Sequence, residues 1–518
     1  MALKDPDLLS VQQARELAAR ARAAQEVLAG FSQEQVDRVV DAMAEAGRAE
    51  AERLARLAHE ETGFGNVRDK TRKNLFAAED VYAYIRPLRT VGVLREDPGT
   101  QVVEIAAPMG VVAAIVPSTN PTSTALYKAL IAIKARNAVV LSPHPSARSC
   151  ILETARVLQA AAAGAGLPPD ALLCMSEVSL EGTQELMRCR DTAVVLATGG
   201  VGLVRAAYGS GKPAYGVGPG NVPAYVEKTA EVARAVRDIL DGKTFDYGTL
   251  CSSEQALVCD EAIADGVREE VRRSGGHFLS PAEAAAVARV VVTPQRLANP
   301  EIVGRPAPFI AEKAGITVPP ETRALVAPLE GVGRDFPLSI EKLCPVLAFY
   351  VVKDWHEGAL RCQALLRFGG TGHTMGLHTR DEAVIRAFGE TMPVFRIVVN
   401  TQTSMGATGY TTGLAPAMSL GCGAWAGNIT SDNITPLHLI NLKRVARGHD
   451  RAPGGAVPRP AGTPASPQAQ PPSVDFVCEE DVRRARLEGT VLRVKRGGIV
   501  TPAARDLAGE SSVLIFEG

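Results

Sequence analysis

Short apolar runs rich in β-branched residues alternate with helical patterns between residues 110 and 197. The runs cover residues 110–117, 137–141 and 192–197, and helical patterns begin at Thr122 and Ser146 between them. Unbroken apolar runs are typical of strands buried on both faces, and strands separated by helices favour a parallel sheet. The sequence therefore predicts an α/β fold whose parallel sheet is covered by helices on both faces.

The segment before this sheet is predicted to be helical and to end in a hairpin. Alanine and leucine recur at three- and four-residue spacing from Ser10 to about residue 89, with Ser10 as the expected N-cap of the first helix. A second helix start is expected at Ser32, because Ser32 and Gln35 have the spacing of a capping box. Residues 92–106 have the pattern of two strands around a turn at Asp97. Such a hairpin would offer an edge for pairing with another subunit.

Composition narrows the class of protein. With 518 residues, 46% hydrophobic composition and a net charge of -1, the chain is expected to form two or three domains and to lack an electrostatic footprint for nucleic acid or an anionic membrane. No signal-peptide core is present, and no apolar run reaches the roughly 18 to 20 residues that span a bilayer. Nine cysteines without a Cys-x-x-Cys pair favour free thiols in a reducing compartment. We therefore expect a cytoplasmic protein with no metal site.

Two loops follow predicted strands at the position where parallel sheets bind ligands. In the first, residues 117–121, the amide of Asn120 is suited to donate to a developing oxyanion, although Asn before Pro also simply forms turns. The second contains Thr198, Gly199 and Gly200, whose small side chains let a pyrophosphate approach a helix N-terminus. A further Gly-rich segment, residues 216–223, contains Gly218 and leads into another predicted strand.

Cys251 lies in a Gly-containing turn, residues 245–255, between two apolar segments, where a thiolate would meet a bound substrate. A cysteine taken at random is more often a small buried hydrophobe than a nucleophile. Cys259, Cys344 and Cys362 are accordingly expected in the core. Cys422, in a Gly-rich segment, is also expected to be buried and is the second choice for a reactive thiol. The context therefore makes Cys251 the candidate covalent catalyst.

Eight motifs taken in order resemble the aldehyde dehydrogenase superfamily, specifically its CoA-acylating branch, over roughly residues 5 to 447. They are residues 118–121, 141–145, 198–200, 218–221, 251–254, 341–346, 368–373 and 420–428. The resemblance implies a Rossmann-like cofactor-binding domain in residues 1–224, with an oligomerisation hairpin at about residues 92–107. It also implies a catalytic domain in residues 225–429, a return segment in residues 430–447 and a homodimer or tetramer.

The same resemblance implies roles for individual residues. Cys251 would be the nucleophile and Asn120 the oxyanion donor, with NAD or NADP as the cofactor, NAD being favoured, and coenzyme A as co-substrate. His373, in a Gly-His pair similar to that of acylating relatives, and Cys422 are further candidates, although a lone histidine in a turn is more often structural. The cofactor-binding set is Ser118, Pro143, His144, Thr198, Gly199, Gly200, Gly218 and Glu341.

Val217 departs from the hydrolytic members of that superfamily, which carry at this position a glutamate that activates water against the thioester. Loss of a positioned base costs about 10²- to 10⁴-fold in the step that it assists. A thiol needs less help, because a few per cent of it is already thiolate near neutral pH. Val217 therefore favours transfer to coenzyme A over hydrolysis.

A second, smaller module is expected after a Pro-rich linker. Residues 448–473 have the composition of a semi-rigid disordered linker. Residues 474–518 are predicted to contain a helix from Glu479 to about Gly489, a strand at residues 490–494 and a helix capped by Thr501. Residues 499–507 resemble segments appended to enzymes of bacterial microcompartments. Such a tail would target the enzyme to a shell or cargo partner, or act as a regulatory or stabilising subdomain, and packaging would imply a volatile or toxic short-chain aldehyde.

Two competing functions follow from the same residues. Residues 218–221 with the strand after them also resemble histidinol dehydrogenase, a zinc enzyme, against which the Cys251 and Asn120 contexts argue. A non-catalytic packaging scaffold is disfavoured because Asn120, Cys251 and Glu341 are all retained. The sequence leaves open the aldehyde, NAD against NADP, dimer against tetramer, and the ligand of the tail.

Overall fold

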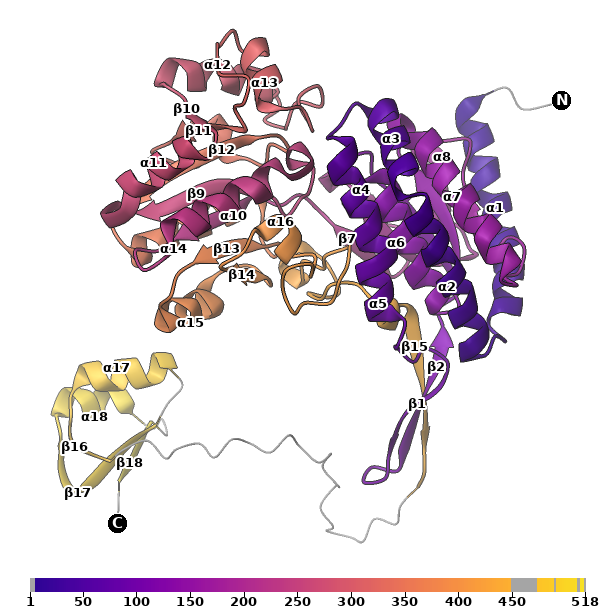
Figure 1. Cartoon of the computed structure of the whole chain (residues 1–518). Coiled ribbons are helices and arrows are strands. Elements are labelled where there is room, and N and C mark those ends of the chain that lie inside the picture. The colour runs from indigo at the N-terminus through magenta and orange to yellow at the C-terminus, as the bar shows by residue number, and fades with distance from the viewer. Residues whose placement is uncertain (1–4, 449–472, 489–490, 510–512, 517–518) are drawn as a thin grey trace. The chain divides into compact units, whose positions relative to one another are not determined.

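The computed structural model describes residues 5–448, 473–488, 491–509 and 513–516. Its contacts divide the chain into two compact units. One comprises Met1–Glu96 and Val103–Val445, and the other comprises Asp97–Val102 and Ala446–Gly518. Figure 1 shows the large unit as two α/β lobes, one containing helices α1–α8 and the other containing strands β9–β14.

The N-terminal region is helical, as the sequence predicts. Its segments are α1 Pro6–Leu28, α2 Gln33–Ala49, α3 Ala51–Thr62, α4 Val67–Leu75, the π-helical η1 Phe76–Val81 and α5 Tyr82–Ile85. The capping box at Ser32 is confirmed. The N-cap prediction at Ser10 is wrong, because the side chain of Asp5 caps α1 and Pro6 occupies its first turn. Ser10 is buried inside α1 and donates to the carbonyl of Glu177 at 2.8 Å.

The first lobe is built on a five-stranded sheet of order β5-β4-β3-β6-β7, in which all neighbouring pairs are parallel. Every residue of β3 and β4 is buried, so helices cover both faces, which confirms the predicted α/β fold. The strands are β3 Val111–Val116, β4 Ala138–Pro143, β5 Leu172–Cys174, β6 Thr192–Thr198 and β7 Ala214–Val217. The helices are α6 Pro121–Lys134, η2 Pro145–Ala147, α7 Arg148–Gly164, α8 Leu180–Arg188 and α9 Val201–Tyr208.

The second lobe contains a seven-stranded parallel sheet of order β10-β11-β12-β9-β8-β13-β14. Helices α10 and α11 pack in one apolar cluster with it, and α14 and α15 pack in another. Cys259, Cys344 and Cys362 are fully buried, as predicted. The strands are β8 Val222–Val226, β9 Glu254–Asp260, β10 Gly276–Phe278, β11 Ala324–Pro328, β12 Val346–Val352, β13 Met375–His378 and β14 Ile397–Val399. The helical segments are α10 Val232–Thr244, η3 Phe245–Gly248, η4 Glu261–Ile263, α11 Ala264–Arg273, α12 Pro281–Val291, α13 Ala307–Lys313, η5 Pro337–Ser339, α14 Trp355–Gly369, α15 Glu382–Thr391, α16 Thr403–Gly406 and η6 Ala424–Ala426. The last 3₁₀ segment, η7 Pro436–Leu439, packs in the core of the first lobe.

The predicted hairpin is present as β1 Gly92–Asp97 and β2 Val102–Pro108. Strand β15, Ile440–Ala446, completes a three-stranded sheet of order β1-β2-β15. Arg444 on β15 pairs with Glu104 on β2 at 3.0 Å. Leu442 and Val445 on β15 are exposed, so this small sheet presents apolar side chains at the surface of the single chain.

The C-terminal segment forms a parallel three-stranded sheet, β16-β17-β18, with two helices. Its elements are β16 Val474–Val477, α17 Glu479–Glu488, β17 Leu492–Val500, α18 Pro502–Ala508 and β18 Leu514–Phe516. Thr501 caps α18, as predicted, and β17 is longer than expected from the sequence. Val477, Val494 and Ala504 belong to a small core of this segment. The linker predicted at residues 448–473 lies, apart from its two end residues, outside the described residues.

Candidate functional site

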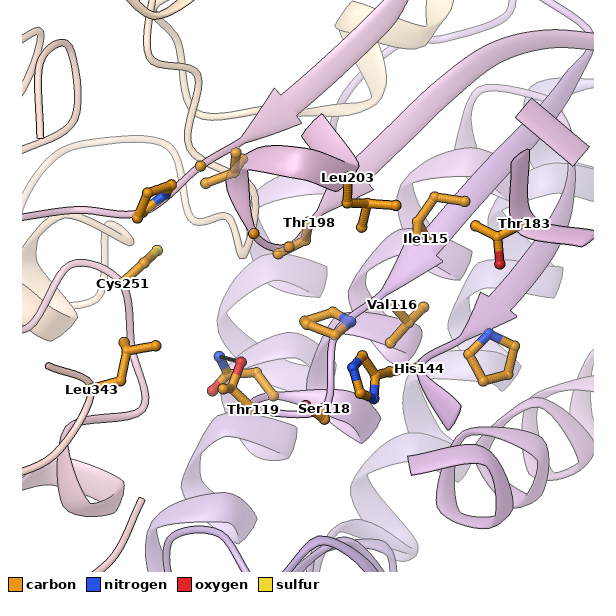
Figure 2. Close-up of a pocket in the computed structure, with 18 of the residues that line it drawn as sticks. Ile115, Val116, Ser118, Thr119, His144, Thr183, Thr198, Leu203, Cys251 and Leu343 are labelled. Atoms are coloured by element: carbon orange, nitrogen blue, oxygen red, sulfur yellow. Dashed lines mark hydrogen bonds between the residues drawn. The ribbon is translucent and has the colours of Figure 1, made fainter. Parts of the chain in front are cut away.

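A cavity of about 470 Å³ lies between the strand ends of the first lobe and the Cys251 segment of the second. Figure 2 shows Cys251 and Leu343 on one side of it, and Thr198, Ser118 and His144 on the other. All ten residues assigned from the sequence to catalysis or cofactor binding line this one cavity. They are Cys251, Asn120, Ser118, Pro143, His144, Thr198, Gly199, Gly200, Gly218 and Glu341. The parallel sheet of the first lobe brings together the loops that follow its strands. Cys251 and Glu341 come to the cavity from the second lobe, in the turns that precede β9 and β12.

Cys251 lies in the turn between η3 and β9, and its Sγ is 3.2 Å from Nε2 of His373. His373 precedes β13, is 1% exposed and places Nδ1 3.0 Å from Oγ1 of Thr374. Burial, with the nearby Glu341 carboxylate, raises the pKa of the Cys251 thiol to about 12. Burial, with the nearby Arg396 guanidinium, lowers the pKa of His373 to about 3. At neutral pH the pair is therefore a neutral thiol facing a neutral imidazole.

Asn120 occupies the N-cap position of α6 but makes no side-chain capping bond to that helix. Its Oδ1 accepts a hydrogen bond of 2.5 Å from Nζ of Lys73. Its Nδ2 donates to Oγ1 of Thr119 at 3.2 Å and to the carbonyl of Thr249 at 3.3 Å. The donor end of the amide is thus held beside the segment that leads to Cys251. Lys73 was not identified from the sequence, since a lysine on an amphipathic helix is ordinarily exposed.

Glu341 lines the same end of the cavity as Cys251. Its Oε1 accepts the backbone N–H of Gly220 at 2.8 Å, which fixes the carboxyl against the Gly-rich turn after β7. Burial raises the pKa of Glu341 to about 7. Among the residues that line the cavity, Glu341 is the only one with a carboxyl group.

Val217 ends β7, lines the cavity and is 3% exposed. It belongs to a small apolar cluster against which Cys251 packs. Position 217, where the family resemblance implies a glutamate in hydrolytic relatives, is thus filled by a buried apolar side chain whose cluster packs against Cys251.

The far end of the cavity has the features of a dinucleotide site. Oγ1 of Thr198, at the end of β6, is one of the buried polar atoms without a hydrogen-bond partner in the described residues. Gly200 precedes α9, whose N-terminal N–H groups face this end. A Cβ at Gly199 would lie 2.5 Å from Cδ2 of Leu203, so only glycine fits there without displacing that side chain. The unpartnered hydroxyl and the glycines fit a bound pyrophosphate.

Cys422 does not line the cavity. It is 4% exposed and its thiol donates to the carbonyl of Leu420. Burial raises the pKa of Cys422, so its thiol is not activated. Arg396, which was not identified from the sequence, is buried nearby and donates to the carbonyl of Gly421 at 2.6 Å.

Neither a cluster of metal ligands nor a membrane-spanning helix occurs among the residues that the structure describes. Residues 5–448 and the described parts of the C-terminal segment contain no group of three or more His, Cys, Asp or Glu side chains placed to hold a metal ion. None of the helices described is both long and apolar enough to cross a membrane.

Comparison with known proteins places this geometry among relatives. The aldehyde dehydrogenase family model matches residues 4–274. The bifunctional aldehyde-alcohol dehydrogenase AdhE of Escherichia coli (strain K12) is 43% identical over 443 residues, which cover 85% of this chain and 50% of AdhE. This chain thus spans about half the length of that relative.

Two solved structures extend the comparison. An acetylating aldehyde dehydrogenase from Geobacillus thermoglucosidasius superposes with a TM-score of 0.86 and 52% identity, covering 87% of this chain and 100% of that one. A propionaldehyde dehydrogenase from the Clostridium phytofermentans fucose utilisation bacterial microcompartment has a TM-score of 0.75 and 26% identity, covering 83% and 96%. The resemblance inferred from the sequence motifs is confirmed.

Proposed function

Because the chain belongs to the aldehyde dehydrogenase family, we propose that it oxidises a short-chain aldehyde to an acyl-CoA, using a nicotinamide cofactor and coenzyme A. The observation that carries the proposal is the placement of Cys251, Asn120 and Glu341 around one cavity with the strand-end loops of the first lobe. The acetylating relative from Geobacillus thermoglucosidasius, 52% identical, supports the acylating branch.

The cavity residues fit a nicotinamide dinucleotide. Thr198, Gly199 and Gly200 would hold its pyrophosphate, and Ser118, Pro143 and His144 line the adjacent strand ends. Glu341 would bind the nicotinamide ribose, at the Cys251 end. When bound, the nicotinamide supplies the acceptor for the hydride that leaves the substrate carbon.

Cys251 performs the covalent step. Its sulfur attacks the aldehyde carbonyl, and the oxygen gains negative charge beside the Asn120 amide and the backbone N–H of Cys251. Because the thiol pKa is about 12 and the His373 pKa about 3, a full proton transfer between them before attack is strongly uphill. The thiol proton therefore passes to Nε2 of His373 as the carbon–sulfur bond forms, and from there to solvent. Loss of hydride from the resulting hemithioacetal oxyanion leaves a thioester on Cys251.

The thioester is then passed to coenzyme A. The thiol of coenzyme A attacks the thioester carbonyl and Cys251 departs, taking up the proton, so that one thioester replaces another. His373, 3.2 Å from the sulfur, is positioned to relay this proton. With Val217 near Cys251 there is no carboxylate to activate water at that position, so hydrolysis is slow relative to transfer. The reaction is reversible because thioester energy is conserved.

Substrate and assembly belong to the same proposal. A small aldehyde such as acetaldehyde or propionaldehyde is the substrate class, and NAD is the favoured cofactor over NADP. The hairpin β1–β2 with β15 and its exposed Leu442 and Val445 would join subunits into a dimer or tetramer. Residues 474–518 would direct the enzyme to a microcompartment shell or cargo partner, as suits the microcompartment origin of one relative. Neither the histidinol dehydrogenase-like alternative nor the packaging scaffold is favoured by an observation in the described residues.

Trapping the acyl-enzyme tests this proposal. Propionaldehyde and NAD without coenzyme A should give a burst of NADH and one propionyl group on the peptide that contains Cys251, identified by mass spectrometry. Addition of coenzyme A should remove the group as propionyl-CoA. Acylation of Cys422 instead, or no acyl-enzyme in a protein that turns over, would overturn the assignment.

A further inference from the structure

A buried cluster of charges lies beside Asn120 and takes part in none of the steps above. Nζ of Lys73, on α4, donates to Oδ1 of Asn120 at 2.5 Å and to the carboxylate of Asp246, and lies 3.3 Å from Oγ1 of Thr249. Lys70, three residues earlier on the same helix, donates to Asp246 at 3.1 Å. The side chains of Lys70, Lys73 and Asp246 are at most 3% exposed.

This cluster decides which end of the Asn120 amide faces the reacting atoms. An ammonium group only donates hydrogen bonds, so it admits only the amide oxygen as its partner. A flipped amide would set its NH₂ group against the Lys73 ammonium and present a lone pair to an oxyanion. With Oδ1 held, Nδ2 is directed toward the cavity, where its bonds to Thr119 and Thr249, at 3.2 and 3.3 Å, are long and readily exchanged for a stronger acceptor.

The backbone at Asp246 adopts an unfavourable conformation to place its carboxylate beside Lys73. Asp246 and Tyr247 have φ of 46° and 53°, in the left-handed region that non-glycine residues rarely adopt. Oδ1 of Asp246 accepts the backbone N–H of Asn66 at 2.9 Å. A Cβ at Gly65 would lie 1.8 Å from that oxygen, so the carboxylate occupies space that only glycine leaves free.

The ammonium also strengthens the amide as a donor. Burial lowers the pKa of Lys73 to about 8, while Asp246 opposes the shift, so Lys73 remains mostly protonated at pH 7. A cation on Oδ1 draws electron density from the amide and makes its N–H more acidic, as hydrogen bonds in a chain polarise one another. Lys73 does not line the cavity, so it does not contact the substrate directly. Its contact with the site is the 2.5 Å hydrogen bond to Oδ1 of Asn120.

We propose that Lys73 is a positioning residue: held by Asp246, it fixes and polarises the Asn120 amide so that Nδ2–H meets the oxyanion formed when Cys251 attacks. The inference rests on the function proposed above. Helix α4 of the first lobe would thereby assist the attack by Cys251, which the second lobe supplies.

A double-mutant cycle in the full-length protein tests it. Lys73→Met should lower kcat for CoA-dependent aldehyde oxidation by about 10- to 100-fold, part of the loss expected for an oxyanion donor, with aldehyde KM changed less than about threefold. In an Asn120→Ala background the same substitution should have little further effect, because its route of action is gone. Lys73→Arg, which keeps a cation on Oδ1, should restore part of the lost kcat.

Lys70→Met is the matched control, because it removes the same charge from the same carboxylate without touching the Asn120 side chain. Its effect should add to that of Asn120→Ala. Thermal unfolding of each variant checks the fold. If Lys73→Met does not fold, the smaller loss of kcat expected for Lys73→Arg is compared between the wild-type chain and Asn120→Ala. If the wild-type enzyme is active and the effects of the Lys73 substitutions add fully to that of Asn120→Ala, the role of Lys73 is overturned while the proposed function stands. An inactive wild-type chain, assayed with coenzyme A and C2–C4 aldehydes, overturns the proposed function and this inference with it.

Discussion

Nε2 of His373 lies 3.2 Å from Sγ of Cys251, and the same cysteine packs against an apolar cluster that contains Val217. The nucleophile is therefore paired with a neutral imidazole, and position 217 provides no carboxylate base to activate water. This arrangement suits a sulfur-to-sulfur acyl transfer, in which only a thiol proton has to move.

Replacing His373 should slow acyl transfer. His373→Ala is expected to lower the rate of propionyl transfer from the enzyme to coenzyme A by about 10²- to 10⁴-fold, the usual contribution of a positioned acid or base. His373→Asn, which keeps a polar group but accepts no proton at neutral pH, should be nearly as slow. Single-turnover measurement of acyl-CoA release checks this, and an unchanged rate in both variants would assign His373 a structural role only.

The reactivity of Cys251 should climb steeply with pH. An acid whose pKa is raised keeps its proton to higher pH, and the pKa of about 12 puts the whole neutral range below the titration. The thiolate fraction, and with it the alkylation rate by iodoacetamide, should rise about tenfold per pH unit from pH 7 to 10 in the cofactor-free protein. Peptide mass spectrometry reports the modification at Cys251; a rate that levels off near pH 7 would show an already ionised thiol.

A carboxylate at position 217 should open the enzyme to water. Val217→Glu is expected to raise CoA-independent formation of free acid by about 10- to 100-fold, a fraction of what a well-positioned base supplies. Because Val217 is 3% exposed, the same change should lower the thermal unfolding temperature. Val217→Gln is the control of similar size without a base. Equal hydrolysis by the two variants would argue against the role given to this position.

Cofactor binding should depend on Gly199. Gly199→Ala would place a Cβ 2.5 Å from Cδ2 of Leu203 and narrow the approach to the α9 N-terminus, which should weaken NADH binding by about tenfold. Gly202→Ala, where nothing lies within 4 Å of the added Cβ, is the control and should bind NADH normally. Fluorescence titration of NADH separates the two. Equal affinities would move the pyrophosphate away from this turn.

Removal of the C-terminal segment should leave the chemistry intact. Every residue that lines the cavity belongs to the larger unit, so a chain ending at Gly448 should keep kcat within about twofold. Steady-state kinetics of the shortened and full-length proteins give the comparison. A large loss would give the segment a catalytic or folding role rather than one in targeting.

Local patterns predicted much of the fold and two loops of the site, whereas Glu341, Pro143 and His144 were assigned only through the family resemblance. The strands beginning at Val111, Ala138 and Thr192 follow directly from apolar runs, and the capping box at Ser32 from spacing alone. The loops at Asn120 and Thr198 were placed at one cavity because parallel strands present their carboxyl ends together. These strands, the capping box and the two loops could be predicted because each depends on neighbouring residues or on a general rule of sheet topology.

The features that could not be predicted from the sequence depend on contacts between residues far apart in the chain. Asp5 caps α1 in place of Ser10, whose hydroxyl is taken by the carbonyl of Glu177 far along the chain. Lys73 is buried because Asp246, distant in sequence, pairs with it, and no local pattern on α4 indicates that. Such partners are settled by tertiary packing, which overrides local preference.

The acyl group on Cys251 is expected to pass to coenzyme A and not to water. The most direct measurement is NADH formation from propionaldehyde and NAD, with and without coenzyme A, with the acyl product identified by mass spectrometry. Sustained turnover is expected to require coenzyme A and to yield propionyl-CoA. Sustained turnover to free propionate without coenzyme A would show that water reaches the thioester, and would contradict this expectation.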